Sequence, residues 1–130
     1  MPSTYARATF VLKGYPKLIS TENAERYRWG NGCDGWHLVK TPELSVIQER
    51  VPPGKAEVRH YHRTSQQFFF VLSGRATLEV EGVTHTLLPQ QGLHVEAGRA
   101  HQLSNRHEAD LVFILTSCPP SHSDRIIPYE

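Results

Sequence analysis

The sequence predicts an all-β protein of one domain, and three observations lead to this prediction. From Trp36 onward, short segments rich in Val, Ile, Leu, Phe and Thr alternate with Gly and Pro, the usual pattern of strands and tight turns. No long stretch has the apolar period of an amphipathic helix. The 130 residues suffice for one hydrophobic core rather than two. Regular short strands of this kind favour a sandwich or a barrel.

Each expected strand is a β-rich run that ends at turn-forming residues. Pro52-Pro53-Gly54 ends one strand, and Glu81-Gly82 marks a hairpin corner where glycine can adopt a positive φ. The expected strands, in order, are Trp36–Lys40, Leu44–Val51, Glu57–His62, Gln67–Leu72, Ala76–Val80, Val83–Leu88, Leu93–Glu96 and Ala109–Thr116.

The two ends of the chain lack this strand pattern. Residues 19–35 are polar and rich in glycine, so we expect at most a helical turn and then a loop. The predicted organisation is therefore an N-terminal segment, residues 1–35, that packs on a β-barrel domain, residues 36–118, followed by a C-terminal tail, residues 119–130.

The segment Gln67–Leu72 is apolar on both faces, whereas a half-exposed strand would alternate. The facing sheet can cover one side. The other side requires the N-terminal segment or a second protomer, and we expect a homodimer.

Composition excludes several classes of partner. Lys and Arg total 14 against 13 Asp and Glu, and no basic cluster is present, so we expect no nucleic-acid partner. No run of about 18 apolar residues occurs, and no signal peptide is recognisable, so we expect a cytoplasmic protein without a membrane partner. Cys33 and Cys118 are interpreted as free thiols, although a disulfide between them stays open.

Histidines supply the most informative pattern. His60 and His62 lie two residues apart in an expected strand, so both imidazoles point to the same face and can reach one metal ion. Gln67 begins the next strand after a short connection and can add a carbonyl oxygen. His101 follows a glycine corner at Gly98 and can bring a further imidazole from a distant strand.

Together these residues resemble the two sequence motifs of the cupin superfamily, G-x5-H-x-H-x(3,4)-E-x6-G and G-x5-P-x-G-x2-H-x3-N. The sequence departs from the motifs at Gln67, where the family usually has Glu, and at Gln90 and Glu96, where the family has Gly and Pro. The positions in register are Gly54, His60, His62, Gln67, Gly74, Gly98, His101 and Asn105.

The resemblance implies a double-stranded β-helix, a jelly-roll-like barrel, with a metal site inside. Its ligands would be His60, His62, Gln67 and His101, and its metal a divalent transition ion, Mn, Fe, Co, Ni or Zn. Gln66 fits the three-residue form of the spacing after His62. Gln67 is preferred because it keeps the six residues that the family motif places before the final glycine, here Gly74. A metal-free cupin that binds a ligand through the same residues, or a half-buried polar histidine pair, remains the alternative.

A site of three neutral imidazoles and one neutral amide leaves the charge of the cation uncompensated, so it should favour anionic ligands. We therefore expect a small-molecule substrate that is oxygenated or carries a carboxylate. The expected chemistry is Lewis-acid isomerisation, tautomerisation or elimination. An iron-dependent dioxygenase and a non-catalytic binding cupin are the two alternatives.

Proton transfer also needs a base. His94 and His85 lie on expected strands, where either could line a pocket or supply the base, and His94 is the candidate for the catalytic base. The pattern leaves one orientation open. Either Gln48 and Arg50 face the interior, which would suggest a carboxylate substrate, or Ile47 and Glu49 do.

Overall fold

The computed structural model describes residues 17–128, and within that range it consists of strands and loops with no helix. No described helix could therefore cross a membrane. The strands are β1 (Glu25–Trp29), β2 (Cys33–Lys40), β3 (Ser45–Val51), β4 (Tyr61–His62), β5 (Gln66–Ser73), β6 (Ala76–Val80), β7 (Val83–Leu87), β8 (Gly92–Val95), β9 (His101–Ser104), β10 (Leu111–Cys118) and β11 (Arg125–Ile126).

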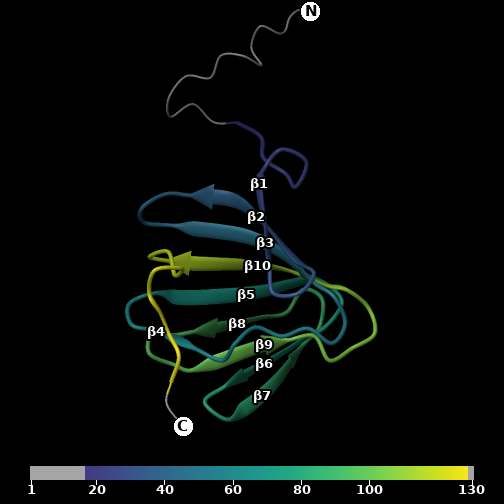
Figure 1. Ribbon diagram of the computed structural model, residues 1–130, viewed down its shortest axis with the longest axis vertical. Helices are drawn as coiled ribbons and strands as arrows, with labels where there is room; N and C mark the ends of the chain where they lie inside the picture. Colours follow the sequence, from purple (N-terminus) through teal and green to yellow (C-terminus); the bar gives the residue numbers. More distant parts are fainter. Residues whose placement is uncertain (1–16, 129–130) are drawn as a thin grey trace, which may run out of the picture.

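The strands form two main sheets whose inner faces meet (Figure 1). A six-stranded sheet has the order β1-β2-β3-β10-β5-β8, a three-stranded sheet has the order β7-β6-β9, and β11 pairs with β4. Phe69 and Phe113 stack between the sheets with ring centroids 6.0 Å apart, and Leu78 and Leu103 are fully buried beside them. The prediction of an all-β protein is confirmed.

Strand β5 shows how alternation sets up the interior. Gln67, Phe69 and Val71 are buried, whereas Phe68 and Leu72 lie at the surface. The two faces are therefore distinct although both are apolar, because side chains in a strand alternate between the faces of the sheet. Gln67 is the second residue of this strand, and its side chain lies on the buried face that points into the barrel.

The expectation of a loop over residues 19–35 is wrong. Strand β1 pairs with β2 along its whole length, from Glu25 opposite His37 to Trp29 opposite Cys33. Asp34 joins the two strands of this hairpin, because the arginines of β1 form ion pairs with its carboxylate. Buried Asp34 accepts hydrogen bonds from Arg50 at 2.6 Å and from Arg26 at 2.7 Å, and both lower the pKa of its carboxyl.

The predicted division at residues 36 and 118 stays a prediction. Strand β2 begins at Cys33 and joins the hairpin to the large sheet, so the boundary at residue 36 falls inside a strand. Residues 1–16 lie outside the described part of the chain, so the expected packing of the N-terminal segment has no structural counterpart there.

The C-terminal segment is anchored beside the histidines. The carboxylate of Asp124 accepts hydrogen bonds from the backbone N–H of Thr64 at 2.8 Å and of Ser65 at 2.9 Å, which lower its pKa to about 2. Strand β11 then pairs Arg125 with His62. The residues expected to form a tail therefore include a strand that pairs with β4, the strand that carries His62, and in Figure 1 the C-terminal segment runs beside β4.

The outer face of β5 is exposed and apolar. Phe68 is 43% and Leu72 36% exposed, and the ring of Phe68 stacks on that of Phe70 with centroids 6.1 Å apart. We propose that a second copy of the chain covers this face.

Light scattering at micromolar concentration is expected to give the mass of a dimer, and Phe68→Arg is expected to give a monomer, because a charge would then have to be buried at the interface. Val83→Arg is the matched control, since Val83 is an exposed apolar residue, 58% accessible, on β7 of the other sheet. A monomeric wild type would contradict the proposal.

Candidate metal centre

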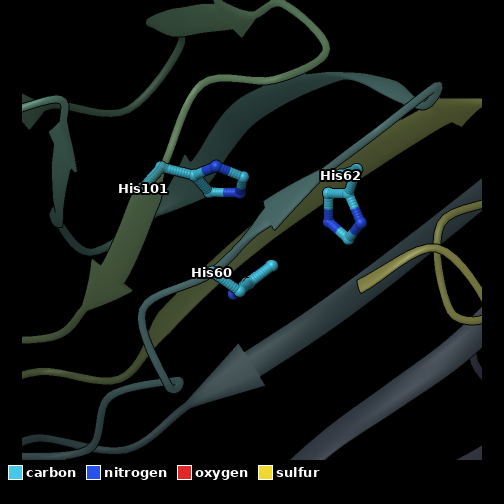
Figure 2. Close-up of side chains that lie close together, drawn as sticks. All are labelled: His60, His62 and His101. Atoms are coloured by element: carbon cyan, nitrogen blue, oxygen red, sulfur yellow. The ribbon is translucent and has the colours of Figure 1, made fainter. Parts of the chain in front are cut away.

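Three histidines from two separate chain segments converge inside the barrel. His60 and His62 come from the segment that ends in β4, and His101 opens β9. Reciprocal backbone hydrogen bonds of 3.0 and 2.8 Å join His60 to His101 and hold the two segments in register. The side chains point toward one another (Figure 2), with one nitrogen from each within 4.8 Å of the others. All three are at most 4% exposed, so these residues can hold a metal ion.

Backbone carbonyls select the tautomer of two rings. Nδ1 of His60 lies 2.6 Å from the carbonyl oxygen of Val58, and Nδ1 of His101 lies 2.9 Å from that of Arg99. A carbonyl oxygen can only accept, so Nδ1 carries the proton in each ring and Nε2 keeps a free lone pair. This is the arrangement that orients imidazoles bound to a metal ion.

Gln67 extends the donor set. Its Nε2 donates to the hydroxyl of Ser117 at 3.1 Å and of Ser121 at 3.2 Å, and its Oε1 then lies 3.1 Å from Nε2 of His101. Two lone pairs facing each other repel, and a cation between or beside them removes the conflict. The structure thus brings Gln67 next to the histidines, and its role as the fourth ligand stays a prediction.

His62 adds a further indication of a missing partner. Both of its ring nitrogens are buried, and neither makes a hydrogen bond of good geometry within residues 17–128. Buried polar atoms in proteins nearly always have a partner, so this ring fits an ion or water that satisfies it.

The histidines are also neutral. Burial lowers the pKa of His62 and of His101, and it lowers the pKa of His60 to about 3. Unprotonated imidazole is the form that binds a metal. Protons therefore compete little with the ion at neutral pH.

A cavity of about 370 Å³ opens onto His60, His62 and Gln67. Charged side chains occupy its wall, including Lys40 at the end of β2 and Arg125 of β11. The cavity is large enough for a small metabolite, and its lining places cationic groups beside the histidines.

Two carboxyl groups on the same wall are the functional candidates that sequence reasoning missed. Glu49 accepts a 2.5 Å hydrogen bond from the hydroxyl of Tyr27, and Glu57 accepts one of 2.9 Å from the backbone N–H of Leu103. Removal from bulk water raises the pKa of Glu49 to about 7 and that of Glu57 to about 8. The available signal for Glu49 was its shared face with Ile47, one of the two orientations that the pattern left open.

The structure settles that orientation against Arg50. Ile47 and Glu49 line the cavity, whereas Arg50 lies on the other face and pairs with Asp34 at 2.6 Å and Asp110 at 3.2 Å. An inward arginine on this strand is therefore not available to a substrate.

His94 does not reach the site. It pairs with Phe68 on the outer side of β5, is exposed, and lies 2.9 Å from Oε1 of Gln66. Its neighbour Val95 is the residue that points into the core, because successive side chains alternate along β8. His85 lines a separate surface hollow together with His94, not the cavity beside His60 and His62.

Solved structures of several proteins share this fold. The chain matches KdgF from a Halomonas species with a TM-score of 0.75 at 19% identity, covering 82% of this chain and 98% of that one. It matches a sugar phosphate isomerase of the cupin superfamily from Silicibacter pomeroyi with a TM-score of 0.68 at 24% identity, covering 81% and 76%. These likenesses show that the fold is the double-stranded β-helix.

Sequence comparison agrees. The polyketide synthase CurC of Streptomyces cyaneus is 34% identical over 73 residues, which are 55% of this chain and 47% of the relative, so the chain spans about half of that protein's length. The model of the cupin domain matches residues 47–117, more than half of the chain and including all four candidate ligands. The chain therefore belongs to the cupin domain family.

Proposed function

We propose that the protein is an enzyme that uses a divalent metal ion as a Lewis acid on a small carboxylate-bearing metabolite, by isomerisation, tautomerisation or elimination. The ligands of the ion would be His60, His62, His101 and Gln67. The observation that carries the proposal is the convergence of three buried, neutral imidazoles, two of which line a cavity with cationic groups on its wall.

The donor set decides the type of chemistry. A divalent ion held by neutral ligands keeps its full charge, and when bound it polarises a carbonyl oxygen of the substrate. The protein's own groups bind and orient the substrate. The sugar phosphate isomerase from Silicibacter pomeroyi, which has the same fold, is consistent with proton-transfer chemistry on a small oxygenated molecule.

Arg125 is the group best placed to bind the substrate carboxylate. It lines the cavity, and within residues 17–128 no acidic side chain forms an ion pair with it; its guanidinium donates to the carbonyl of Val58 at 3.4 Å. Guanidinium and carboxylate form charge-assisted hydrogen bonds, which discriminate strongly in favour of an anionic ligand.

The test has two steps, metal loading and anion binding. The purified protein is expected to retain, or to take up after chelation, one divalent ion per chain, measured by elemental analysis and calorimetry. Pyruvate is then expected to change the water-proton relaxation of the Mn²⁺-loaded protein, because an oxygen of pyruvate that reaches the ion would replace water there.

Arg125→Gln is expected to weaken pyruvate binding about tenfold, the loss that corresponds to one charge-assisted hydrogen bond. Arg106→Gln is the matched control, since Arg106 is exposed and remote from this cavity. A protein that binds no metal, or a loaded protein that ignores pyruvate, would contradict the proposal. Oxygen uptake by the Fe²⁺-loaded protein would favour the dioxygenase alternative instead.

A further inference from the structure

Glu49 and Tyr27 form a couple that spans three strands. Tyr27 of β1 lies opposite Gly35 of β2, and Gly35 lies opposite Glu49 of β3. The Tyr27 side chain crosses β2 directly over Gly35, where a Cβ would overlap its ring. Because glycine leaves that space open, the Tyr27 hydroxyl can reach the Glu49 carboxylate at 2.5 Å.

The couple shares the cavity with two of the three histidines. Tyr27 and Glu49 both line it, together with His60 and His62, and Glu49 is not part of the cluster whose ligand atoms converge. A carboxyl group beside a metal site but outside its ligand set is free to exchange protons with a bound molecule.

The proton affinity of Glu49 suits that role. Removal from water raises its pKa to about 7, while the Tyr27 hydrogen bond and the positive charge of Arg125 act in the opposite direction. A base with a pKa near the working pH is the most effective, since it is both available and able to return the proton. Glu57, the other carboxyl on this wall, is bound by the backbone of Leu103.

We propose that Glu49 is the general base and acid of the site and that Tyr27 is its positioning residue. The inference rests on the proposed function, because the substrate must lie between Glu49 and the histidines. In the proton-transfer step a C–H bond next to the substrate carbonyl breaks and the Glu49 carboxylate takes the proton. The electron pair moves into the new carbon–carbon double bond, and the carbonyl π pair moves onto the oxygen. Return of a proton from Glu49 to carbon completes the cycle.

Deuterium exchange into pyruvate tests this step without knowledge of the natural substrate. The Mn²⁺-loaded protein in D₂O is expected to replace methyl protons of pyruvate by deuterium, followed by mass spectrometry. Glu49→Gln is expected to lower the exchange rate about a hundredfold, the usual contribution of a general base, while Mn²⁺ and pyruvate affinities stay unchanged. Glu43→Gln, at an exposed turn, is the matched control and should exchange as the wild type does.

Tyr27→Phe provides a readout that a merely structural role would not give. The Tyr27 hydrogen bond lowers the pKa of Glu49, so its loss should raise that pKa and move the inflection of the rate–pH profile to higher pH. In the metal-free protein, ¹³C NMR of labelled Glu side chains is expected to show a carboxyl that titrates near pH 7, absent from Glu49→Gln and shifted upward in Tyr27→Phe.

Each outcome separates the two proposals. Suppose that Mn²⁺ and pyruvate bind normally. If Glu49→Gln then exchanges deuterium as fast as the wild type, or if the wild type does not exchange at all, the role of Glu49 is overturned and the proposed metal site stands. Loss of exchange only in Glu57→Gln assigns the base to the other carboxyl and also overturns it. Failure of the wild type to bind Mn²⁺ or pyruvate defeats the proposed function, and the base with it.

Discussion

Replacing His101 by alanine is expected to abolish tight binding of divalent metal. His101 is 1% exposed, contributes one of the three converging nitrogens, and lies 3.1 Å from Oε1 of Gln67. Loss of a residue that only supports a ligand usually lowers metal affinity ten- to a hundredfold, so loss of a direct ligand should exceed about a hundredfold. Calorimetric titration of the metal-free variant with Zn²⁺ or Mn²⁺ measures the change.

His94→Ala is the matched control for His101→Ala. Both remove one imidazole, but His94 lies on the outer surface against Gln66. The metal affinity of the His94→Ala protein should equal that of the wild type. Circular dichroism and thermal unfolding establish whether each variant keeps its fold. A folded His101→Ala protein that binds metal as the wild type does would contradict the three-histidine site.

The metal-free protein is expected to lose stability as the pH rises from 7 to 8. The pKa of Glu57 is raised to about 8 and that of Glu49 to about 7. At any pH between the ordinary glutamate pKa of 4.5 and these raised values, the folded state therefore holds more protons than the unfolded state. Stability must then fall with increasing pH. Below pH 6.5 the three histidines act in the opposite sense, because they are neutral when folded and protonated when unfolded.

The expected loss from Glu57 between pH 7 and pH 8 is about 1 kcal/mol, since it is still mostly protonated in the folded state over that interval. Urea unfolding at a series of pH values measures it. Glu57→Gln keeps an oxygen that can accept from Leu103, and its stability should be flatter above pH 7 than that of the wild type. A wild-type curve that rises from pH 7 to 8 would show that the carboxyl groups of Glu49 and Glu57 are ionised as in water.

Strands β5, β6 and β7 could be predicted because their causes are local, whereas β9, which carries His101, and β11 were not among the expected strands. The hairpin at Glu81-Gly82 needs residues that tolerate positive φ, and both have it, 49° and 90°. The spacing of His60 and His62 places both rings on one face in any extended strand. Gln67 likewise keeps its face through the strict alternation of β5.

Strand β1 was missed because polar side chains, not an apolar alternation, join it to its neighbour β2. Arg26 and Arg28 look solvated in the sequence, and only the folded chain brings both of them to Asp34. The same is true of Tyr27, whose hydroxyl partner Glu49 lies 22 residues away. Rules based on apolar periodicity give no weight to polar side chains that contact each other across paired strands.

The sequence by itself indicated the all-β class and the three histidines that can hold a metal ion, because strand alternation and motif spacing depend on near neighbours along the chain. Tertiary structure decided what surrounds those residues. It turned Glu49 inward and Arg50 outward, placed His94 on the surface, and brought Arg125 back to the cavity. These choices follow from strand register and from the anchored C-terminal segment, which are set by contacts between residues far apart in the chain.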